Sequence, residues 1–344
     1  MHSDFREASA VKTSAQDHLL IGVDIGRTTR AALIDSRGNI LLKSRDITNT
    51  RSAQALIDQL IEIIRRIQSS EPAGGAVAAA GIGFPGLTNM RTHRIEAMPN
   101  LTDISDIDIY QEITEATGIP VIFDNDANVA AYGEWRIGAG RGYRDMFYIT
   151  MGTGVGSGLI LNGQFYHGCK GFAGEFGHIT VDPIEGIECG CGNTGCLETI
   201  VSGPNMVRRV REFVLRDNAY ASSALTMQRG DELNCDSIFR AAAEGDNLAK
   251  IIIQQTAQYL GIAIAAMINV LNIEAVVIGG GVMSAGELLL KPIIEETRRR
   301  AFAPSYACCN IVAGALKEDA GIIGAAMLAR DMLAGERLHP GIGQ

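Results

Sequence analysis

Two segments of this chain open in the same way, each with an apolar run, a turn that contains glycine and a second strand-like run. The first run leads to Val23-Asp24-Ile25-Gly26, and the second leads to Met151-Gly152-Thr153-Gly154. Such internal similarity is the sequence signature of a repeated architecture. It predicts two related lobes with a cleft between the copies.

Strand-like and helix-like runs alternate along the rest of the chain, which predicts an α/β fold. Apolar residues recur at intervals of three and four between Ala53 and Gln68, so this segment is expected to bury one helix face. Further helices are expected near 107–117, 204–214, 236–244 and 247–271, and strands at AVAAAGIGF, PVIFD, DMFYIT, AVVIGGG and NIVAG. The last helix is expected to start at Asp319 and to pack back on the first lobe.

These runs predict how the chain divides. Residues 1–17 are expected to form a flexible N-terminal extension, and residues 18–125 with about 319–335 are expected to form a small N-terminal lobe. Residues 126–318 would form a large C-terminal lobe, with the hinge between Asn125 and Arg144.

The balance of charged and apolar residues disfavours several classes of protein. The chain carries a formal charge of −9, whereas nucleic-acid binders gather Lys and Arg on one face. The first seventeen residues contain no apolar core of a signal peptide. The longest apolar stretch, Ile251 to Leu271, is interrupted by glutamine and asparagine, which are costly in hydrocarbon. We therefore expect a cytoplasmic protein that binds neither nucleic acid nor membrane.

Four residues between 178 and 196 match the ligand set of a structural zinc ion. They supply one imidazole and three thiolates, which complete a tetrahedral shell and leave no position for a catalytic water. The alternative is a set of buried cysteines beside an incidental histidine. The predicted ligands of this zinc knuckle are His178, Cys189, Cys191 and Cys196.

Both glycine-containing turns are candidate phosphate sites. Glycines alternate from Gly152 to Gly158, which lets backbone N–H groups approach a phosphate, although a glycine-rich hairpin shows the same pattern. No Lys-Ser or Lys-Thr follows, so this is not a Walker A loop. Asp24 ends the first apolar strand, where a carboxylate either holds magnesium through water or serves only as a turn residue. Two such turns facing each other across a cleft form a nucleotide-phosphate arrangement.

Asn125 and Asp126 precede a helix-like segment, and both residue types serve well as N-caps. The functional alternative is a general base, which phosphoryl transfer to an alcohol requires. Spacing alone does not separate these two roles. Glu175 and Glu198 flank the predicted zinc ligands, so an ordered knuckle would position two carboxylates that accept hydrogen bonds from sugar hydroxyls.

Taken together, the motifs closely resemble the ROK family of repressors, open reading frames and sugar kinases, and within it the bacterial glucokinases. The likeness runs from about Leu19 to Arg330. The matching segments are VDIGRTT, GIGFPGLTN, PNL, NDANVAAYGEW, MGTGVGSGLILNG, GEFGHITVD, CGCGNTGCLE, AVVIGGGV and DAGIIGAAMLA.

The resemblance implies a two-lobed, actin-like ATPase fold of the hexokinase and RNase H-like type, in which sugar and ATP meet in the interlobe cleft. Asp126 would then be the base that acts on the 6-hydroxyl of a hexose, with glucose as the leading candidate. The residues implied to bind or border the sugar are Gly83, Asn100, Asn125, Glu175, His178 and Glu198. Those implied to face the ATP phosphates and magnesium are Asp24, Gly26, Thr28, Thr153 and Gly154, and Gly280 and Gly281 would border the adenosine.

Two further expectations follow from the resemblance. One ring nitrogen of His178 would bind zinc while the other reaches a sugar hydroxyl, so that zinc fixes the tautomer. Kinases of the family usually carry a second glycine and then Thr-Lys in the first phosphate motif, where this chain has Arg27, Thr28 and Thr29. Arg27 either reaches a phosphate or crowds the turn, which leaves weak ATP use or an inorganic polyphosphate donor as alternatives.

Other functions stay open at this point. N-acetylmannosamine, N-acetylglucosamine, allose, fructose and mannose are alternative substrates, since sugars that differ at one hydroxyl are separated by a few pocket side chains. A non-catalytic sugar sensor is a second alternative. Repressors of the family carry a winged-helix domain ahead of the kinase-like portion, and only about eighteen residues precede the first expected strand here. The resemblance also implies a homo-oligomer, either a dimer or a tetramer.

Overall fold

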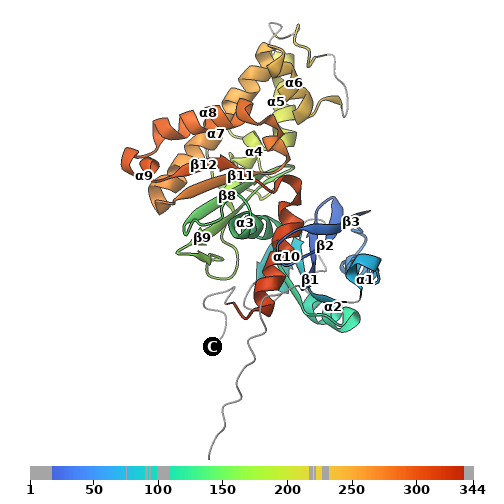
Figure 1. The fold of residues 1–344 in the computed structure, drawn as a ribbon. Helices are drawn as coiled ribbons and strands as arrows, with labels where there is room; N and C mark the ends of the chain where they lie inside the picture. The colour runs from blue at the N-terminus through green and yellow to red at the C-terminus, as the bar shows by residue number, and fades with distance from the viewer. Residues whose placement is uncertain are drawn as a thin grey trace, which may run out of the picture.

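The computed structural model describes residues 18–74, 76–89, 92, 94–98, 108–216, 220, 222–226 and 232–336. The expected extension at 1–17 and the predicted sugar-binding residue Asn100 lie outside the described residues. Two five-stranded sheets form the centre of the described structure, and the helices lie against their faces (Figure 1). The α/β prediction is confirmed.

The first sheet has the strand order β3-β2-β1-β4-β7. Strands β1 (Leu19–Ile25), β2 (Thr28–Ile34) and β3 (Ile40–Ile47) are antiparallel, while β4 (Val77–Phe84) and β7 (Val121–Asn125) run parallel to β1. Side chains alternate along β1 because successive residues of a strand point to opposite faces. Ile21 and Val23 pack with helices α1 (Ala53–Gln68) and α2 (Ile109–Thr117), and Leu20 packs with α10 (Ala320–Leu333).

The second sheet repeats this arrangement with the order β10-β9-β8-β11-β12. Strands β8 (Met146–Met151), β9 (Val155–Leu161) and β10 (Gln164–Phe165) are antiparallel, and β11 (Ala275–Gly279) and β12 (Asn310–Ala313) run parallel to β8. The equal pairing order confirms that the two halves are copies of one architecture.

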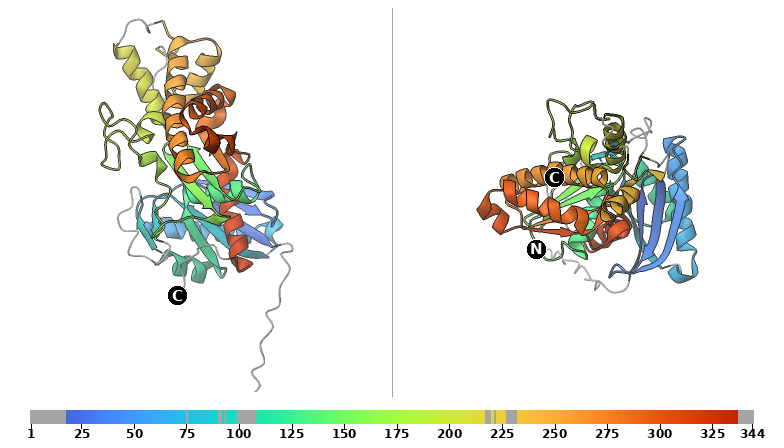
Figure 2. Two further views of the ribbon diagram at one scale, coloured as in Figure 1. Left: turned by 90° about the vertical axis from the view of Figure 1, so that its left-hand side faces the viewer. Right: turned by 90° about the horizontal axis from the view of Figure 1, so that it is seen from above.

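Helices cover the second sheet on both faces. On the outer face, the core includes residues of α5 (Gly203–Arg216), α6 (Cys235–Ala243), α7 (Asn247–Leu271) and α8 (Glu287–Arg300), with α9 (Ala303–Ala307) beside α7 (Figure 2). On the inner face, Met146 and Tyr148 pack with α3 (Asp126–Arg136). The outer helices therefore belong to the second half alone, whereas α3 lies between the two sheets.

Helices α3 and α10 lie side by side between the two sheets (Figure 1). Glycines permit this close approach, because a Cβ at Gly324 would lie 1.7 Å from Val129 O and one at Gly22 would lie 1.8 Å from Ile322 O. No side chain larger than hydrogen fits at such distances. The helix nearest the C-terminus is thus packed against the N-terminal sheet, which brings the two ends of the described chain together in one half.

Helix α7 is long and apolar enough, by length and composition, to cross a membrane. Its most apolar window is 56% buried inside the protein, where α8, α5 and α6 pack against it. Burial against neighbouring helices accounts for the apolar composition of this helix.

Candidate active site

The site is built around the start of α3. Asn125 is the N-cap, since its Oδ1 accepts hydrogen bonds from the backbone N–H groups of Ala127 (2.9 Å) and Asn128 (3.2 Å). Its Nδ2 donates to Gly86 O at 3.0 Å, which ties the cap to the turn after β4. Because Asn125 satisfies the exposed amides of the helix, Asp126 is not required for capping. The open choice between these two residues is therefore resolved in favour of Asn125 as the cap.

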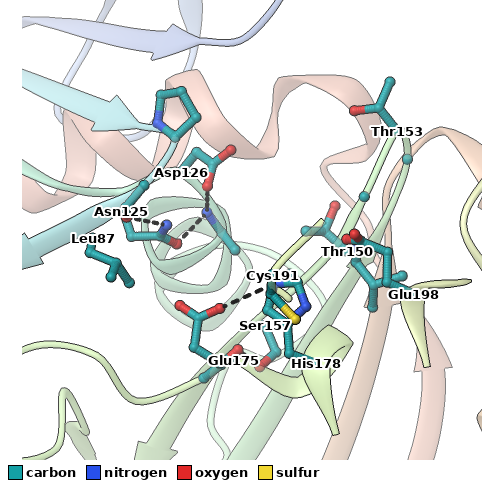
Figure 3. Close-up of a pocket in the computed structure, with 18 of the residues that line it drawn as sticks. Leu87, Asn125, Asp126, Thr150, Thr153, Ser157, Glu175, His178, Cys191 and Glu198 are labelled. Carbon is teal, nitrogen blue, oxygen red and sulfur yellow. Dashed lines mark hydrogen bonds and ion pairs between the residues drawn. The ribbon is translucent and has the colours of Figure 1, made fainter. Parts of the chain in front are cut away.

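A cavity of about 910 Å³ opens in front of Asp126. Its walls come from the turn after β4, the start of α3, the β8–β9 turn, the segment 173–178 and the start of α4 (Glu198–Val201) (Figure 3). Of the residues predicted from the sequence, those that line it are Asn125, Asp126, Thr153, Gly154, Glu175, His178, Cys191 and Glu198. Gly152 and Gly156 of the candidate phosphate turn line it as well. Lining residues that the sequence did not single out are Pro85, Gly86, Leu87, Met98, Ala127, Thr150, Val155, Ser157, Ala173 and Gly174.

The carboxylate of Asp126 has an unusual proton affinity. Burial raises the pKa of Asp126 to about 7, with further increases from the negative charges of Asp24 and Glu175. A hydrogen bond from the Ala127 amide opposes this rise. A group that titrates near neutrality can both accept and release a proton at physiological pH, which is the property of a general base.

Glu175 and His178 reach the cavity from a short 3-10 turn, η3 (Phe176–His178). His178 Nε2 lies 3.8 Å from Glu175 Oε2. The segment before this turn packs on β9: Gly174 has a positive φ of 99°, and a Cβ there would lie 2.8 Å from Ser157 O. Ser157 Oγ donates to Gly174 O at 2.6 Å. The alternating glycines around Ser157 were the only sequence signal for this contact, because they allow the close packing.

Glu198 supports the glycine-rich turn between β8 and β9. Its Oε2 accepts a hydrogen bond from Val155 N at 2.8 Å, and a Cβ at Gly154 would lie 2.7 Å from the same oxygen. A side chain at Gly154 would therefore displace the carboxylate. The glycine-rich turn and Glu198, the predicted sugar-binding glutamate, therefore hold each other in place.

The four predicted zinc ligands are gathered in one place, with all their ligand atoms within 4.8 Å of one another. Cys191 Sγ lies 3.7 Å from Cys196 Sγ, and Cys189 Sγ lies 3.6 Å from His178 Nδ1. A tetrahedral zinc ion with ordinary bond lengths separates two sulfurs by about 3.8 Å and a sulfur from a nitrogen by about 3.6 Å. The residues present therefore fit the ion. His178 turns Nδ1 to this cluster and Nε2 towards Glu175 on the cavity side.

Several residues predicted to bind nucleotide lie outside the cavity lining, among them Asp24, Gly26 and Thr28. Arg30 donates to Asp24 Oδ2 in an ion pair, and it also donates to Glu318 O at 2.5 Å. Burial raises the pKa of Asp24, which the Arg30 charge partly opposes. Arg27 is exposed at the tip between β1 and β2.

Three predicted glycines also lie outside the lining. Gly83 is buried behind the site, where a Cβ would lie 2.6 Å from Val129 Cγ2 and 3.3 Å from Asp126 Cα. Gly280 has a φ of +87°, and a Cβ there would lie 2.3 Å from Met151 O. Gly281 faces open space. Gly83 and Gly280 thus make room for backbone next to the site.

A buried hydrogen bond behind the cavity, between His167 and Asp124, was not foreseen from the sequence. His167 Nε2 lies 2.6 Å from Asp124 Oδ2. Asp124 Oδ1 accepts from Asn125 N (2.7 Å) and from Asn128 Nδ2 (2.8 Å). The pair joins the start of α3 to the segment after β10, and it thereby braces the backbone that carries Asp126. Neither residue belongs to a motif with its own chemical signature, so no local pattern predicted the contact.

Comparison with known proteins places the chain in a family. The sequence profile of the ROK family matches residues 20–332. The chain belongs to the ROK family. It is 39% identical to a glucokinase of Halalkalibacterium halodurans over 91% of this chain and 96% of that protein. The ROK prediction is confirmed.

Two solved ROK structures resemble this one. The ROK glucokinase of Streptomyces griseus, in complex with glucose and AMPPNP, has a TM-score of 0.78 and 34% identity over 91% of this chain and 99% of that one. A ROK transcriptional regulator, a homologue of the Escherichia coli Mlc protein, has a TM-score of 0.83 and 28% identity over 94% of this chain and 80% of that one. The fold is the two-lobed, actin-like ATPase fold predicted from the sequence.

Proposed function

We propose that this protein is an ATP-dependent hexose kinase that phosphorylates glucose at the 6-hydroxyl. The observation that carries the proposal is Asp126, a carboxylate with a pKa near 7 on the wall of a cavity that also exposes Glu175, His178 and Glu198. Similarity to glucokinases, including one solved with glucose and an ATP analogue, supports the same substrate pair.

In this mechanism Asp126 accepts the proton of the 6-hydroxyl as its oxygen attacks the γ-phosphorus of ATP. The bond between that phosphorus and the β,γ-bridging oxygen breaks, which releases ADP and leaves glucose 6-phosphate. The cap Asn125 and the acceptors Glu175 and Glu198 hold the sugar hydroxyls, with His178 beside them. Gly83 contributes by leaving space for the Asp126 backbone. Asn100, which belongs to the PNL motif, is also proposed to bind the sugar.

The ATP phosphates are proposed to lie on the turn at Thr153 and Gly154. Asp24, Gly26 and Thr28 would approach them from the first sheet when the lobes close, and Gly280 and Gly281 would border the adenosine. Asp24 Oδ2 is held by Arg30, and Oδ1 makes no hydrogen bond to a described residue, so Asp24 would be able to hold Mg²⁺ through water. When bound, Mg²⁺ neutralises charge on the transferring phosphoryl group.

Structural zinc is proposed at the four-residue cluster. The interatomic distances given above support this assignment. The ion would hold His178 in the tautomer that leaves Nε2 for the sugar. We also propose a cytoplasmic location, a homo-oligomer, and two lobes formed by residues 18–125 with about 319–335 and by residues 126–318.

The deciding experiment is a coupled ADP-release assay with magnesium-ATP. The panel is glucose, mannose, fructose, allose, N-acetylglucosamine and N-acetylmannosamine. Inorganic polyphosphate is tested as a second donor, and because it releases no ADP, that reaction is followed by detection of the sugar phosphate. Glucose is expected to give the highest kcat/KM. Preference for another sugar would change the substrate assignment. No phosphoryl transfer from either donor would indicate a non-catalytic sugar sensor.

A further inference from the structure

A second cavity lies at the junction of the two halves, away from Asp126. It has a volume of about 340 Å³, and its lining includes no residue of the larger cavity. The walls come from the end of α3, the connection from α3 to β8, the β9–β10 turn and α10. The lining side chains are Trp135, Arg136, Arg141, Tyr143, Arg144 and Arg330.

Four of these six side chains are arginines, and no acidic residue of the described part of the chain lines the cavity. Asp331 neutralises part of the charge, because its carboxylate lies 2.7 Å from Arg136 Nε and 2.7 Å from Arg330 Nε. Glu336 adds a second contact to Arg136 at 2.6 Å. Arg141 and Arg144 are exposed and form no ion pair with any described residue. Two arginine side chains that form no ion pair with a described residue therefore face one cavity in a chain of net charge −9.

The walls are held in place before any ligand binds. The Arg136 guanidinium lies over the Trp135 ring, 5.1 Å from its centroid, and Trp135 Nε1 donates to Tyr143 O at 3.0 Å. The backbone of Arg144 is fixed on both sides: its N–H donates to Glu274 Oε2 (2.7 Å) and its carbonyl accepts from Gly163 N (2.7 Å). A ligand would meet an ordered backbone, so little entropy is lost there on binding.

We propose that this cavity binds a small phosphate monoester through Arg141 and Arg144. A phosphate dianion carries two charges and three acceptor oxygens, which match two guanidinium groups better than a single carboxylate does. The small volume suits a metabolite and excludes a polynucleotide. Because the walls combine α3 and α10 with the β9–β10 turn, the ligand would bridge segments of both halves. This inference does not rest on the proposed kinase activity.

The only tryptophan of the chain, Trp135, lines this cavity and reports on it directly. Glycerol 3-phosphate is titrated while tryptophan fluorescence is followed, with glycerol as the uncharged control and isothermal calorimetry as an independent measure of affinity. Saturable binding is expected with glycerol 3-phosphate alone. The double variant Arg141→Gln/Arg144→Gln is expected to weaken it at least tenfold, and Asp126→Asn is expected to bind as the parent does.

The matched control is Arg216→Gln/Arg240→Gln, which removes two exposed arginines from α5 and α6. It keeps the net charge equal to that of the test variant and should leave the affinity unchanged. The proposal is overturned if calorimetry detects no saturable binding to the parent. It is also overturned if the Arg141/Arg144 variant, folded by circular dichroism, binds as tightly as the parent or if both double variants lose affinity equally.

Discussion

The two halves of the molecule share one sheet order, yet the turns at the ends of their first strands differ in chemistry. In the first half, Asp24 and Arg30 are direct cross-strand partners on β1 and β2, and they form an ion pair. At the equivalent positions of β8 and β9 the partners are Thr150 and Gly156, which are uncharged, and the turn between these strands, Gly152-Thr153-Gly154, lines the cavity. Opposite charges at facing positions satisfy each other, whereas a turn without charged side chains leaves its backbone accessible.

This difference shows that a duplicated scaffold does not duplicate a function. The cavity takes most of its walls from the second half and from the start of α3, while the first half supplies the turn after β4 and the distant charge of Asp24. Substitutions in the two halves should therefore have separable effects, which the following experiments measure.

The largest effect is expected at Asp126, the first residue of α3. Asp126→Asn removes the proposed base and should lower kcat by about 10²–10⁴-fold. Stability should not fall, because Asn125 caps the helix and burial already disfavours the charged form of Asp126. Steady-state kinetics and thermal unfolding measure the two quantities, with Asp58→Asn on the exposed face of α1 as the control. Turnover within a few fold of the parent would exclude Asp126 as the base.

The second-largest effect is expected at the proposed zinc site, all of whose ligands lie in the second half. Cys196→Ser removes one ligand of the proposed zinc site and should weaken sugar binding by about tenfold or more, since metal-bound histidines depend on their surroundings for orientation. Metal content by mass spectrometry and sugar affinity by calorimetry test this. Cys308→Ser, at an exposed cysteine outside the cluster, is the matched control. A folded, zinc-free protein with unchanged sugar affinity would contradict the shared role of His178.

Two adjacent glycines at the end of β11 give a smaller and purely structural contrast. Gly280→Ala places a Cβ against Met151 O at a positive φ and should lower the free energy of unfolding by about 1–3 kcal/mol. Gly281→Ala meets open space and should change it by less than about 0.5 kcal/mol. Urea unfolding measures both. Equal losses would show that the close approach to β8 does not decide stability here.

The smallest effect tests the electrostatic link between the halves. The deprotonated form of Asp126 is the active one, so kcat/KM should fall about tenfold per pH unit below about 7. Asp24→Asn removes a negative charge that raises this pKa and should move the midpoint to lower pH by less than about one unit. Asp46→Asn, on β3 of the same sheet, should leave the midpoint unchanged. A midpoint that stays fixed in Asp24→Asn would mean that Asp24 does not influence Asp126.

Much of the fold was predictable from neighbouring residues in the sequence. The apolar spacing from Ala53 to Gln68 gave the limits of α1, because a helix face is defined by residues three and four apart. The zinc ligands were predictable because imidazole and thiolate groups bind zinc by virtue of their residue type. Their clustering needed the short glycine-rich segment between Cys189 and Cys196 and the antiparallel pairing of Thr180 with Cys196, which brings His178 to the cysteines.

What only the tertiary structure decided is which side chains meet. The β1–β2 register placed Arg30 opposite Asp24, β9 packing brought Ser157 to Gly174, and the fold joined Asp124 to His167. The sequence by itself determined the repeated strand-turn-strand pattern, the helix periods and the metal-binding residue types, all of which arise from short-range spacing. Contacts between distant segments depend on strand register and helix packing. Both depend on many residues together, so a short stretch of sequence does not predict them.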